Sequence, residues 1–404
     1  MHILLIHQAF TALDEPGGTR HHELARHLAS QGHRVTIIAS PISYLTGKAR
    51  IAKMSWAEKQ PDGDLINILR AYTYPALHRS FAFRMISFFS FMASSFLIGL
   101  RVKNVDLVWG TSPPIFQGIT AWVLARIKRI PFLFEVRDLW PAFAVAVGVL
   151  RNPLLIRLSE WLESFLYHRA NLVLVNSPGF IQHVRDHGAS RVELVSNGTD
   201  TSMFNPNADG EEFRQTHGLD AKFVVLYAGA HGLSNDLGIV LEAAKELLPR
   251  KDIFLVLLGD GKDKSALQTQ ATRNALDNIL FLPPIPKIEM PYAIAAADAC
   301  IAILKPVEMY KTTYPNKVFD YMASGKPVIL AIDGVIRQVI EDAGGGIPVP
   351  PGDPVALSKA ILFLADNPDL SHNMGCQARI YVETHFDRVI LATKLLDIML
   401  GMVA

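Results

Sequence analysis

The stretch His2–Ser40, "HILLIHQAFTALDEPGGTRHHELARHLASQGHRVTIIAS", decides the fold because it holds one complete strand–helix–strand unit. The apolar run 2–7 predicts a buried strand, and a second such run follows at 34–40. Between them, Leu24, Leu28 and the neighbouring alanines recur at helical spacing, which predicts a helix over 19–31 that Gly32 ends. Two strands joined by a helix pair in parallel within one sheet.

The rest of the chain repeats this pattern. Continuous apolar strands follow at 105–110 ("VDLVWG"), 131–136 ("PFLFEV") and 171–176 ("NLVLVN"), as is typical of parallel sheets covered on both faces. After the turn-rich segment "SNGTDTSMFNPN" (196–207) the pattern restarts with "KFVVLYAGA" (222–230), a helix near 238–248 and "IFLVLLGDG" (253–261). We predict an α/β protein with two doubly wound Rossmann-like parallel-sheet domains facing across a cleft. They comprise residues 1–197 and 198–385, and a last helix at 386–404 packs back on the first.

The composition excludes several classes of protein. A formal net charge of +1 over 404 residues does not favour binding to nucleic acid. The two cysteines, Cys300 and Cys376, are too few for a disulfide framework or a four-cysteine zinc site and fit a reducing compartment. Because the N-terminus lacks the features of a secretory signal, we expect a cytoplasmic chain.

The sequence also gives little support for a metal site. Asp62-Gly63-Asp64 has two acids, but "QPDGDL" is an ordinary turn sequence. His21 and His22 do not have a metal-binding spacing, and no acid lies where a zinc protease needs one. We therefore expect no metal and no other cofactor.

Ligands of doubly wound sheets bind beyond the carboxyl ends of the strands, so polar residues and glycines there are candidates for the site. Gly17 and Gly18 follow the first strand and precede a helix, where backbone N–H groups can face a phosphate. We expect Arg20 on the acceptor side of the site, where it either adds a positive charge or is merely solvated. An ordinary glycine turn explains the pair equally well.

Arg137, Asp138 and Trp140 lie just after the strand 132–136. We expect Arg137 and Asp138 to face the acceptor side of the site. The alternative is a surface ion pair beside a buried tryptophan.

Two glycine turns follow neighbouring strands of the second half. "YAGAHG" ends one strand with Gly229 and His231, and "LLGDG" ends the next with Gly259. Together with Asn316 and Lys317 after a third strand, they predict an electropositive opening the size of a phosphate.

The stretch 310–330, "YKTTYPNKVFDYMASGKPVIL", contains a helix of about two turns. Asn316 is a good N-cap and Gly325 a good residue to end the helix. Lys317 and Asp320 then lie near the positive end of the helix dipole. A cation is electrostatically unfavourable there unless an anion lies nearby, and a diphosphate would provide one.

The segment Phe81–Leu100 is as long as a membrane span, with Arg84 as its sole charge. It should not span, because the strands on both sides belong to one sheet. It is either a core helix or a helix in the membrane interface flanked by Arg79, Arg101 and Lys103. Its six phenylalanines favour the interface.

These motifs, in this order, resemble the retaining GT-B glycosyltransferases of glycosyltransferase family 4, above all bacterial enzymes of O-antigen and capsule assembly. The resemblance rests on "GGTRHHELARHLASQGHRVTIIAS", "FEVRDLWP", "VSNGTDTSMFNP", "LYAGAHGLSNDLGIVLEAA", "LLGDG" and "YPNKVFDYMASGKPVI". It implies a hexosyltransferase that moves a sugar, for example an N-acetylated hexosamine or a deoxyhexosamine, from a UDP-linked donor to a glycan or polyprenyl-diphosphate-linked acceptor. It also implies a location on the inner face of the cytoplasmic membrane, which would explain the segment Phe81–Leu100.

The resemblance also implies roles for individual residues. Lys317 would stabilise the departing diphosphate, Asp320 would bind the ribose and Asp138 would orient the acceptor or the sugar. Family members carry a glutamate at the position of Thr312, eight residues before Asp320, so the donor sugar would instead meet Thr312, Thr313 or Tyr314. Relatives often have an arginine and a lysine where this chain has His231 and Asn235. Binding of the diphosphate would therefore depend more on Lys317.

Two other functions fit the same sequence. A nucleotide-sugar 2-epimerase has a related two-domain architecture and would need no interfacial helix. A catalytically inactive partner that binds sugar nucleotides would fit the missing glutamate.

Overall fold

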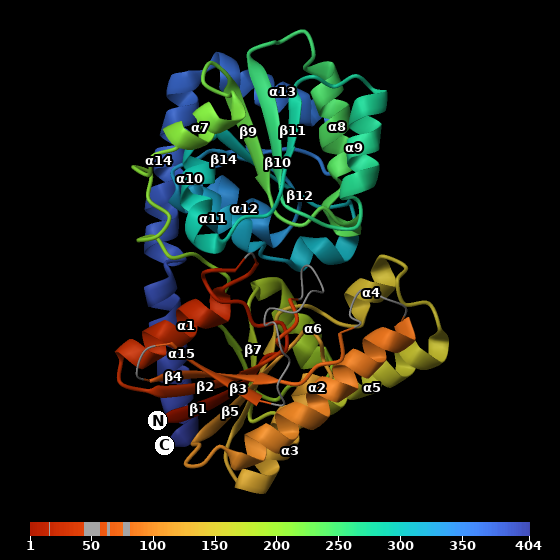
Figure 1. Ribbon diagram of the computed structural model, residues 1–404, viewed down its shortest axis with the longest axis vertical. Coiled ribbons are helices and arrows are strands. Elements are labelled where there is room, and N and C mark those ends of the chain that lie inside the picture. Colours follow the sequence, from red (N-terminus) through yellow and green to blue (C-terminus); the bar gives the residue numbers. More distant parts are fainter. Residues whose placement is uncertain (16, 44–56, 63–64, 76–80) are drawn as a thin grey trace. The chain divides into compact units, whose positions relative to one another are not determined.

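The computed structural model describes residues 1–15, 17–43, 57–62, 65–75 and 81–404 and divides the chain into two compact units (Figure 1). Unit 1 contains Met1–Ala12, Thr19–Ser196 and Val389–Ala404, and unit 2 contains Leu13–Gly18 and Asn197–Arg388. Each unit has a parallel sheet between helices, so the predicted α/β class is confirmed. Of the turn expected at Asp62-Gly63-Asp64, residues 63–64 lie outside the described residues, and so does Arg79.

Unit 1 is built on a sheet of eight strands in the order β3-β4-β2-β1-β5-β6-β7-β8. All neighbours pair in parallel except β3, which pairs antiparallel with β4 at the edge of the sheet. The strands are β1 (His2–Ile6), β2 (Arg34–Ala39), β3 (Ala57–Asp62), β4 (Ile66–Ala71), β5 (Leu107–Thr111), β6 (Phe132–Val136), β7 (Leu172–Val175) and β8 (Val192–Leu194).

Helices cover both faces of this sheet. On one face Leu24 and Leu28 of α1 pack with Leu395 and Met399 of α15 against β1, β2 and β5. On the other face α3 packs on β5, and α2 and α5 pack beside α3 (Figure 1). The helices are α1 (Arg20–Ser30), α2 (Phe81–Arg101), α3 (Gln117–Lys128), α4 (Ala142–Ala146), α5 (Pro153–Arg169), η1 (Pro178–Phe180), α6 (Ile181–Asp186) and α15 (Arg388–Val403).

Unit 2 has a six-stranded, fully parallel sheet in the order β11-β10-β9-β12-β13-β14. The strands are β9 (Phe223–Ala228), β10 (Ile253–Leu258), β11 (Ile279–Leu282), β12 (Ala299–Ile303), β13 (Val328–Ala331) and β14 (Gly346–Pro348). The chain reverses its direction of winding between β9 and β12, which are neighbours although β10 and β11 separate them in sequence. This is the place where doubly wound sheets bind ligands.

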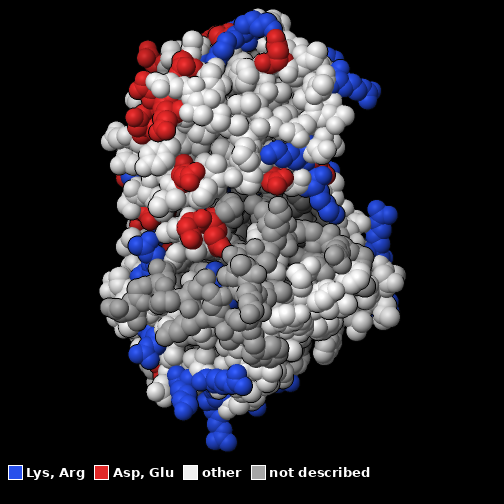
Figure 2. Space-filling view, viewed as in Figure 1, with Lys and Arg blue, Asp and Glu red and all other residues white. Residues whose placement is uncertain are grey.

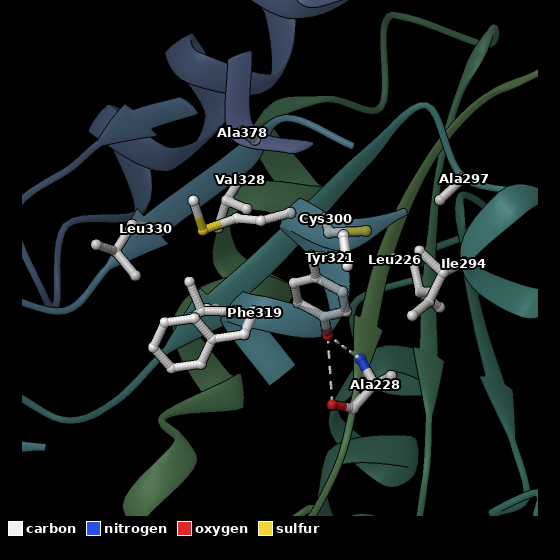
Figure 3. Packing of buried hydrophobic residues seen from close by; sticks show 14 of the residues in the cluster. Leu226, Ala228, Ile294, Ala297, Cys300, Phe319, Tyr321, Val328, Leu330 and Ala378 are labelled. Atoms are coloured by element: carbon white, nitrogen blue, oxygen red, sulfur yellow. Dashed lines mark hydrogen bonds between the residues drawn. The ribbon is translucent and has the colours of Figure 1, made fainter. Parts of the chain in front are cut away.

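The helices of unit 2 cover both faces of its sheet. They are α7 (Glu211–His217), η2 (Leu233–Asn235), α8 (Leu237–Glu246), α9 (Lys264–Arg273), η3 (Lys287–Glu289), α10 (Met290–Ala295), η4 (Glu308–Thr312), α11 (Asn316–Ala323), α12 (Val335–Ala343), α13 (Pro354–Asp366) and α14 (Pro368–His385). The core beneath α11 contains Phe319 and Tyr321 (Figure 3). The Tyr321 hydroxyl accepts a hydrogen bond from Ala228 N at 2.8 Å and donates one to Ala228 O at 3.3 Å, which fixes α11 to the end of β9 (Figure 3).

Candidate functional site

The short helix α11 begins one residue earlier than predicted. Pro315 is its N-cap, so Asn316 is the first helical residue and its side chain makes no capping bond, which corrects the predicted N-cap. Asn316 Oδ1 is buried, and within the described part of the chain it has no hydrogen-bond partner. Gly325 has a φ of +67° just after the helix, in agreement with its predicted role in ending it.

Lys317 brings its amino group to the ends of β9 and α11. Its Nζ lies 3.8 Å from the centroid of the Tyr227 ring. A Cβ added to Gly229 would lie 2.5 Å from this nitrogen, so the glycine leaves the space that the lysine fills. Lys317 has no ion pair among the residues that the structure describes. Burial lowers the pKa of Lys317 to about 7.

The two predicted glycine turns lie against each other. Gly229 and Gly259 both have a φ of +148°, and a Cβ on Gly259 would lie 1.8 Å from the carbonyl oxygen of Gly229. His231 N donates to Asp260 O at 2.8 Å, and Asp263 N donates to His231 O at 3.0 Å. The turns therefore form one connected edge beside Lys317, as the sequence predicted.

His231 is a fully buried side chain of this edge. Neither of its ring nitrogens has a hydrogen-bond partner among the described residues. Burial, followed by the charges of Lys264 and Lys317, lowers the pKa of His231 to about 4. The imidazole is therefore neutral at pH 7 and offers one N–H donor to a ligand.

Asp320 is the second charged residue of α11, and both of its oxygens are occupied. Oδ1 accepts from Thr199 Oγ1 at 2.8 Å, and Oδ2 lies 2.5 Å from Lys287 Nζ. Lys287 also lies over the Phe204 ring, 4.5 Å from its centroid. Thr199 and Lys287 were not predicted as site residues, and no local pattern in the sequence indicates them.

The residues expected around the donor sugar make mostly internal contacts. Thr312 Oγ1 donates to Met309 O at 2.6 Å, and Thr313 Oγ1 donates to Tyr310 O at 2.8 Å. The Tyr314 ring packs edge-on against the Phe319 ring, with centroids 5.6 Å apart. Tyr314 thus packs its ring against the core of unit 2, and its place in the donor site stays a prediction.

Gly17 and Gly18 lie in the segment Leu13–Gly18, which groups with unit 2. The carbonyl oxygens of Leu13 and Glu15 accept bonds from Ile288 N and Lys287 N at 3.3 and 3.4 Å. Both glycines are exposed, and a Cβ on Gly18 would meet no atom within 4 Å. The backbone is therefore open to a ligand at Gly18. Gly17 has a φ of +142°, a conformation that favours glycine.

Unit 1 contains a buried charged cluster around Glu135, a residue that the sequence analysis did not select. Glu135 Oε1 accepts from Arg20 Nε at 3.1 Å, and Oε2 accepts from His21 Nε2 at 2.6 Å and Trp109 Nε1 at 3.2 Å. Arg20 also donates to the carbonyl oxygens of Val195 and Ser196 at 2.7 and 2.6 Å. Arg20 is thus 2% exposed and holds the scaffold together, which corrects its predicted place on the acceptor side.

Arg137 extends this cluster towards the ends of β5 and β6. Its NH1 group lies 3.2 Å from His21 Nδ1, and its Nε donates to Ser112 O at 2.9 Å. Burial lowers the pKa of His21 to about 4, so the neutral ring accepts from Arg137 and donates to Glu135. Burial alone raises the pKa of Glu135, but His21 and Arg20 outweigh it and hold this pKa well below its usual value.

Asp138 and Trp140 follow β6, as predicted, and burial of the Asp138 carboxyl argues against an exposed surface pair of Arg137 and Asp138. Asp138 Oδ1 and Trp140 Nε1 are buried and have no hydrogen-bond partner within the described residues. Burial raises the pKa of Asp138 to about 6, although Arg137 acts against this shift. A carboxyl in this state can act near pH 7 as an acceptor or, when protonated, as a donor.

The helix α2 buries only one of its faces, although its sequence is not divided into a polar and an apolar face. Its buried side chains include Ser87, Phe91 and Ser94, while Phe89 and Ile86 are about half exposed. The segment Phe83–Arg101 is long and apolar enough to cross a membrane by length and composition, and a third of it is buried. One face therefore covers unit 1, and the other presents apolar side chains on the surface.

A possible set of metal ligands is present in unit 1. Ligand atoms of Glu163, His183 and His187 lie within 4.8 Å of one another. Glu163 Oε1 accepts from Tyr167 at 2.8 Å and is 2.9 Å from His183 Nε2, so these side chains satisfy each other without an ion. This group lies apart in sequence from His21 and His22.

The two parallel-sheet units have the architecture of the GT-B fold, and unit 2 places the buried Lys317 beside two glycine turns. The model of the glycosyl transferase 4-like domain matches residues 17–198, and that of glycosyl transferases group 1 matches residues 222–367. The chain belongs to the family 4-like glycosyltransferases of the GT-B fold and is a hexosyltransferase, as the motifs predicted.

Several known proteins are similar to this chain. It is 23% identical to WcaI of Escherichia coli K12, a protein named as a colanic acid biosynthesis glycosyl transferase. The alignment spans 321 residues, which are 77% of this chain and 78% of WcaI. It is 28% identical over 182 residues to a GDP-mannose-dependent alpha-mannosyltransferase of Mycolicibacterium smegmatis, 45% of each chain. The structure of Anabaena HepE in complex with UDP and glucose has a TM-score of 0.74 at 17% identity, over 99% of this chain and all of HepE.

Proposed function

We propose that this glycosyltransferase moves a sugar from a nucleoside diphosphate sugar to a lipid-linked acceptor in the assembly of a surface polysaccharide, with retention of the anomeric configuration. The observation that supports this proposal most is the position of Lys317 beside two glycine turns and a helix N-terminus. Lys317 is a cation without an anionic partner among the described residues. A diphosphate supplies the missing negative charge. The relationship to WcaI supports a role in polysaccharide assembly.

The chemistry follows from this arrangement. Negative charge develops on the diphosphate as the sugar leaves through an oxocarbenium-like state. Lys317, the N–H groups of α11 and the His231 N–H donor stabilise this charge, which is the electrostatic contribution that usually dominates catalysis. No step of this scheme needs a metal ion. Asp320 binds the ribose hydroxyls, and the adjacent Lys287 holds its carboxylate in place.

We propose UDP as the nucleotide of the donor. The complex of HepE with UDP and glucose supports this choice, while the GDP-mannose-dependent relative offers the main alternative. The test is a thermal-shift panel of UDP, GDP, ADP and TDP sugars, since a ligand stabilises the folded state according to its concentration and affinity. A larger shift with a GDP sugar than with any UDP sugar would overturn the assignment of uridine.

The exposed apolar face of α2 supports a peripheral position on the inner face of the cytoplasmic membrane. Phe89 is 52% exposed and Ile86 48% exposed on this helix. Replacing both by serine should release the protein from membrane fractions, while the melting temperature stays within a few degrees. Membrane association that does not change in this variant argues against the interface.

The decisive measurement for the reaction follows radiolabel from the donor. Label that moves into an organic-soluble lipid product supports transfer. Release of free hexosamine would indicate an epimerase, and donor binding without any turnover would indicate an inactive partner. The anomeric configuration of the product, read by NMR, tests retention.

A further inference from the structure

Unit 1 contains a pocket of about 490 Å³ between α2, α5, the start of α3 and the segment after β6. A volume of this size is typical of sites for small molecules. One cation, Arg84, and one carboxyl, Asp138, are the charged residues of its lining. Most of the other lining residues are apolar, among them Phe88, Ile115, Phe116, Leu155, Leu158 and Leu162.

One wall of the pocket carries a polar pair that the protein leaves unsatisfied. Asp138 Oδ1 is an acceptor and Trp140 Nε1 a donor, and both are buried without a partner among the described residues. Leaving such groups unpaired costs roughly 1–3 kcal/mol each, so native structures rarely keep them. A hydroxyl has the chemistry that both atoms lack, because it donates to a carboxylate and accepts from an indole N–H.

The apolar lining continues onto the protein surface along both helices. Phe89 and Ile86 of α2 are about half exposed, and so is Leu158 of α5, while Trp161 is 64% exposed. Where the surface over α2 and α5 is not covered by grey atoms, Figure 2 shows it to be mostly uncharged. An apolar ligand that enters from a membrane thus meets hydrocarbon side chains from the surface to the pocket.

We propose that the pocket binds the isoprenoid part of an amphiphilic acceptor, with a hydroxyl of that acceptor between Asp138 and Trp140. The inference rests on the lipid-linked acceptor of the proposed function and specifies where this chain holds it. A free sugar does not fit as well, because an apolar lining leaves most of its hydroxyls unpaired. Asp138 thereby positions the acceptor by accepting a hydrogen bond from its hydroxyl.

The binding test uses farnesol, an isoprenoid alcohol, and isothermal titration calorimetry with the intact protein. Leu158→Gln places a polar group in the lining at a side chain that is 52% exposed, so folding is not at risk. The matched control is Ile127→Gln on α3, which is 54% exposed and outside the lining. We expect farnesol to bind about tenfold more weakly to Leu158→Gln and with unchanged affinity to Ile127→Gln. If farnesol binds the two variants with equal affinity, the proposal that this pocket binds the isoprenoid is wrong.

A second comparison tests the polar pair. The wild type should prefer farnesol to the hydrocarbon farnesene by about five- to tenfold, and Asp138→Leu should remove this preference while it still binds farnesene. No preference in the wild type, or competition of farnesol by free N-acetylglucosamine, would overturn the inference. UDP-sugar binding in unit 2, measured by thermal shift on the wild type beside its farnesol binding, separates the outcomes. Normal donor binding without farnesol binding refutes the pocket, and farnesol binding without any donor binding refutes the proposed transferase.

Discussion

The state of Lys317 leads to a prediction about protons. Its pKa is about 7 in the ligand-free protein because it is buried. At pH 8 about a tenth of these lysines are therefore charged. A bound diphosphate next to the amino group favours the ammonium form and returns the pKa towards its ordinary value of about 10.4. Binding of UDP at pH 8 should thus take up about 0.9 proton, and the affinity should fall by up to about tenfold per pH unit from 7.5 to 9.

Other groups of the site do not mimic this signal. The pKa of His231 is lowered to about 4, so His231 stays neutral over the same range. The terminal phosphate of UDP titrates near pH 6, as phosphate esters do, and is fully ionised above pH 7.5. The proton taken up between pH 7.5 and 9 is therefore assigned to Lys317.

Calorimetry in two buffers with different heats of ionisation measures the proton uptake directly. Lys317→Met should lose both the uptake and the pH dependence of UDP binding. Lys311→Met is the control, because Lys311 is an exposed lysine that pairs with Glu308 at 2.7 Å. Lys317→Ala should also lower kcat/KM by about a hundredfold, as expected when one group that stabilises the departing charge is removed. An uptake that persists in Lys317→Met, or is absent in the wild type, would refute the argument.

Three further predictions concern the surroundings of this site. Asp320→Ala should lower kcat/KM about a hundredfold with folding intact, and near-normal turnover would exclude it from the donor site. Gly229→Ala should weaken UDP binding at least tenfold, because the new Cβ would lie 2.5 Å from Lys317 Nζ and the backbone has a φ of +148°; Gly401→Ala, where a Cβ meets no atom within 4 Å, is the control. Glu135→Gln should cost about 3–5 kcal/mol of unfolding free energy at pH 7, since it removes the carboxylate charge that faces the buried Arg20. The pKa of Glu135 is lowered in the folded state, so the ionised carboxylate stabilises the fold above about pH 4.3, and this stabilisation is lost as the pH falls further. Urea denaturation should therefore show that the difference in unfolding free energy between the wild type and Glu135→Gln shrinks below this pH.

The sequence predicted the sheets because burial leaves a local pattern. The run Ile253–Leu258 is apolar throughout and forms a strand paired on both sides. The glycine turns were predicted for the same reason, since they follow directly on such strands. One boundary moved by a single residue, from Asn316 to Pro315, because several backbone conformations satisfy the same capping signals.

Contacts between distant residues could not be predicted in this way. Lys287 is 33 positions from Asp320 and Thr199 is 121 positions from it, and no spacing rule joins them. Glu135 did leave a signal, because it is the one charged residue in the buried strand "FLFEV". A carboxylate in such a strand requires buried partners, but only the fold shows that they are Arg20, His21 and Trp109.

The substitution at Thr312 acquires a physical meaning from these contacts. Where relatives carry a carboxylate, this chain has a hydroxyl that donates to Met309 O. The nearby carboxylate of Asp320 is already paired with Lys287. Neither position therefore offsets the charge of Lys317 at the positive end of α11, and burial lowers the pKa of Lys317 to about 7. The positive charge is balanced only when an anion binds, so a diphosphate should be held mainly by Lys317 and the helix end, while contacts with the donor sugar depend on neutral hydrogen-bonding groups.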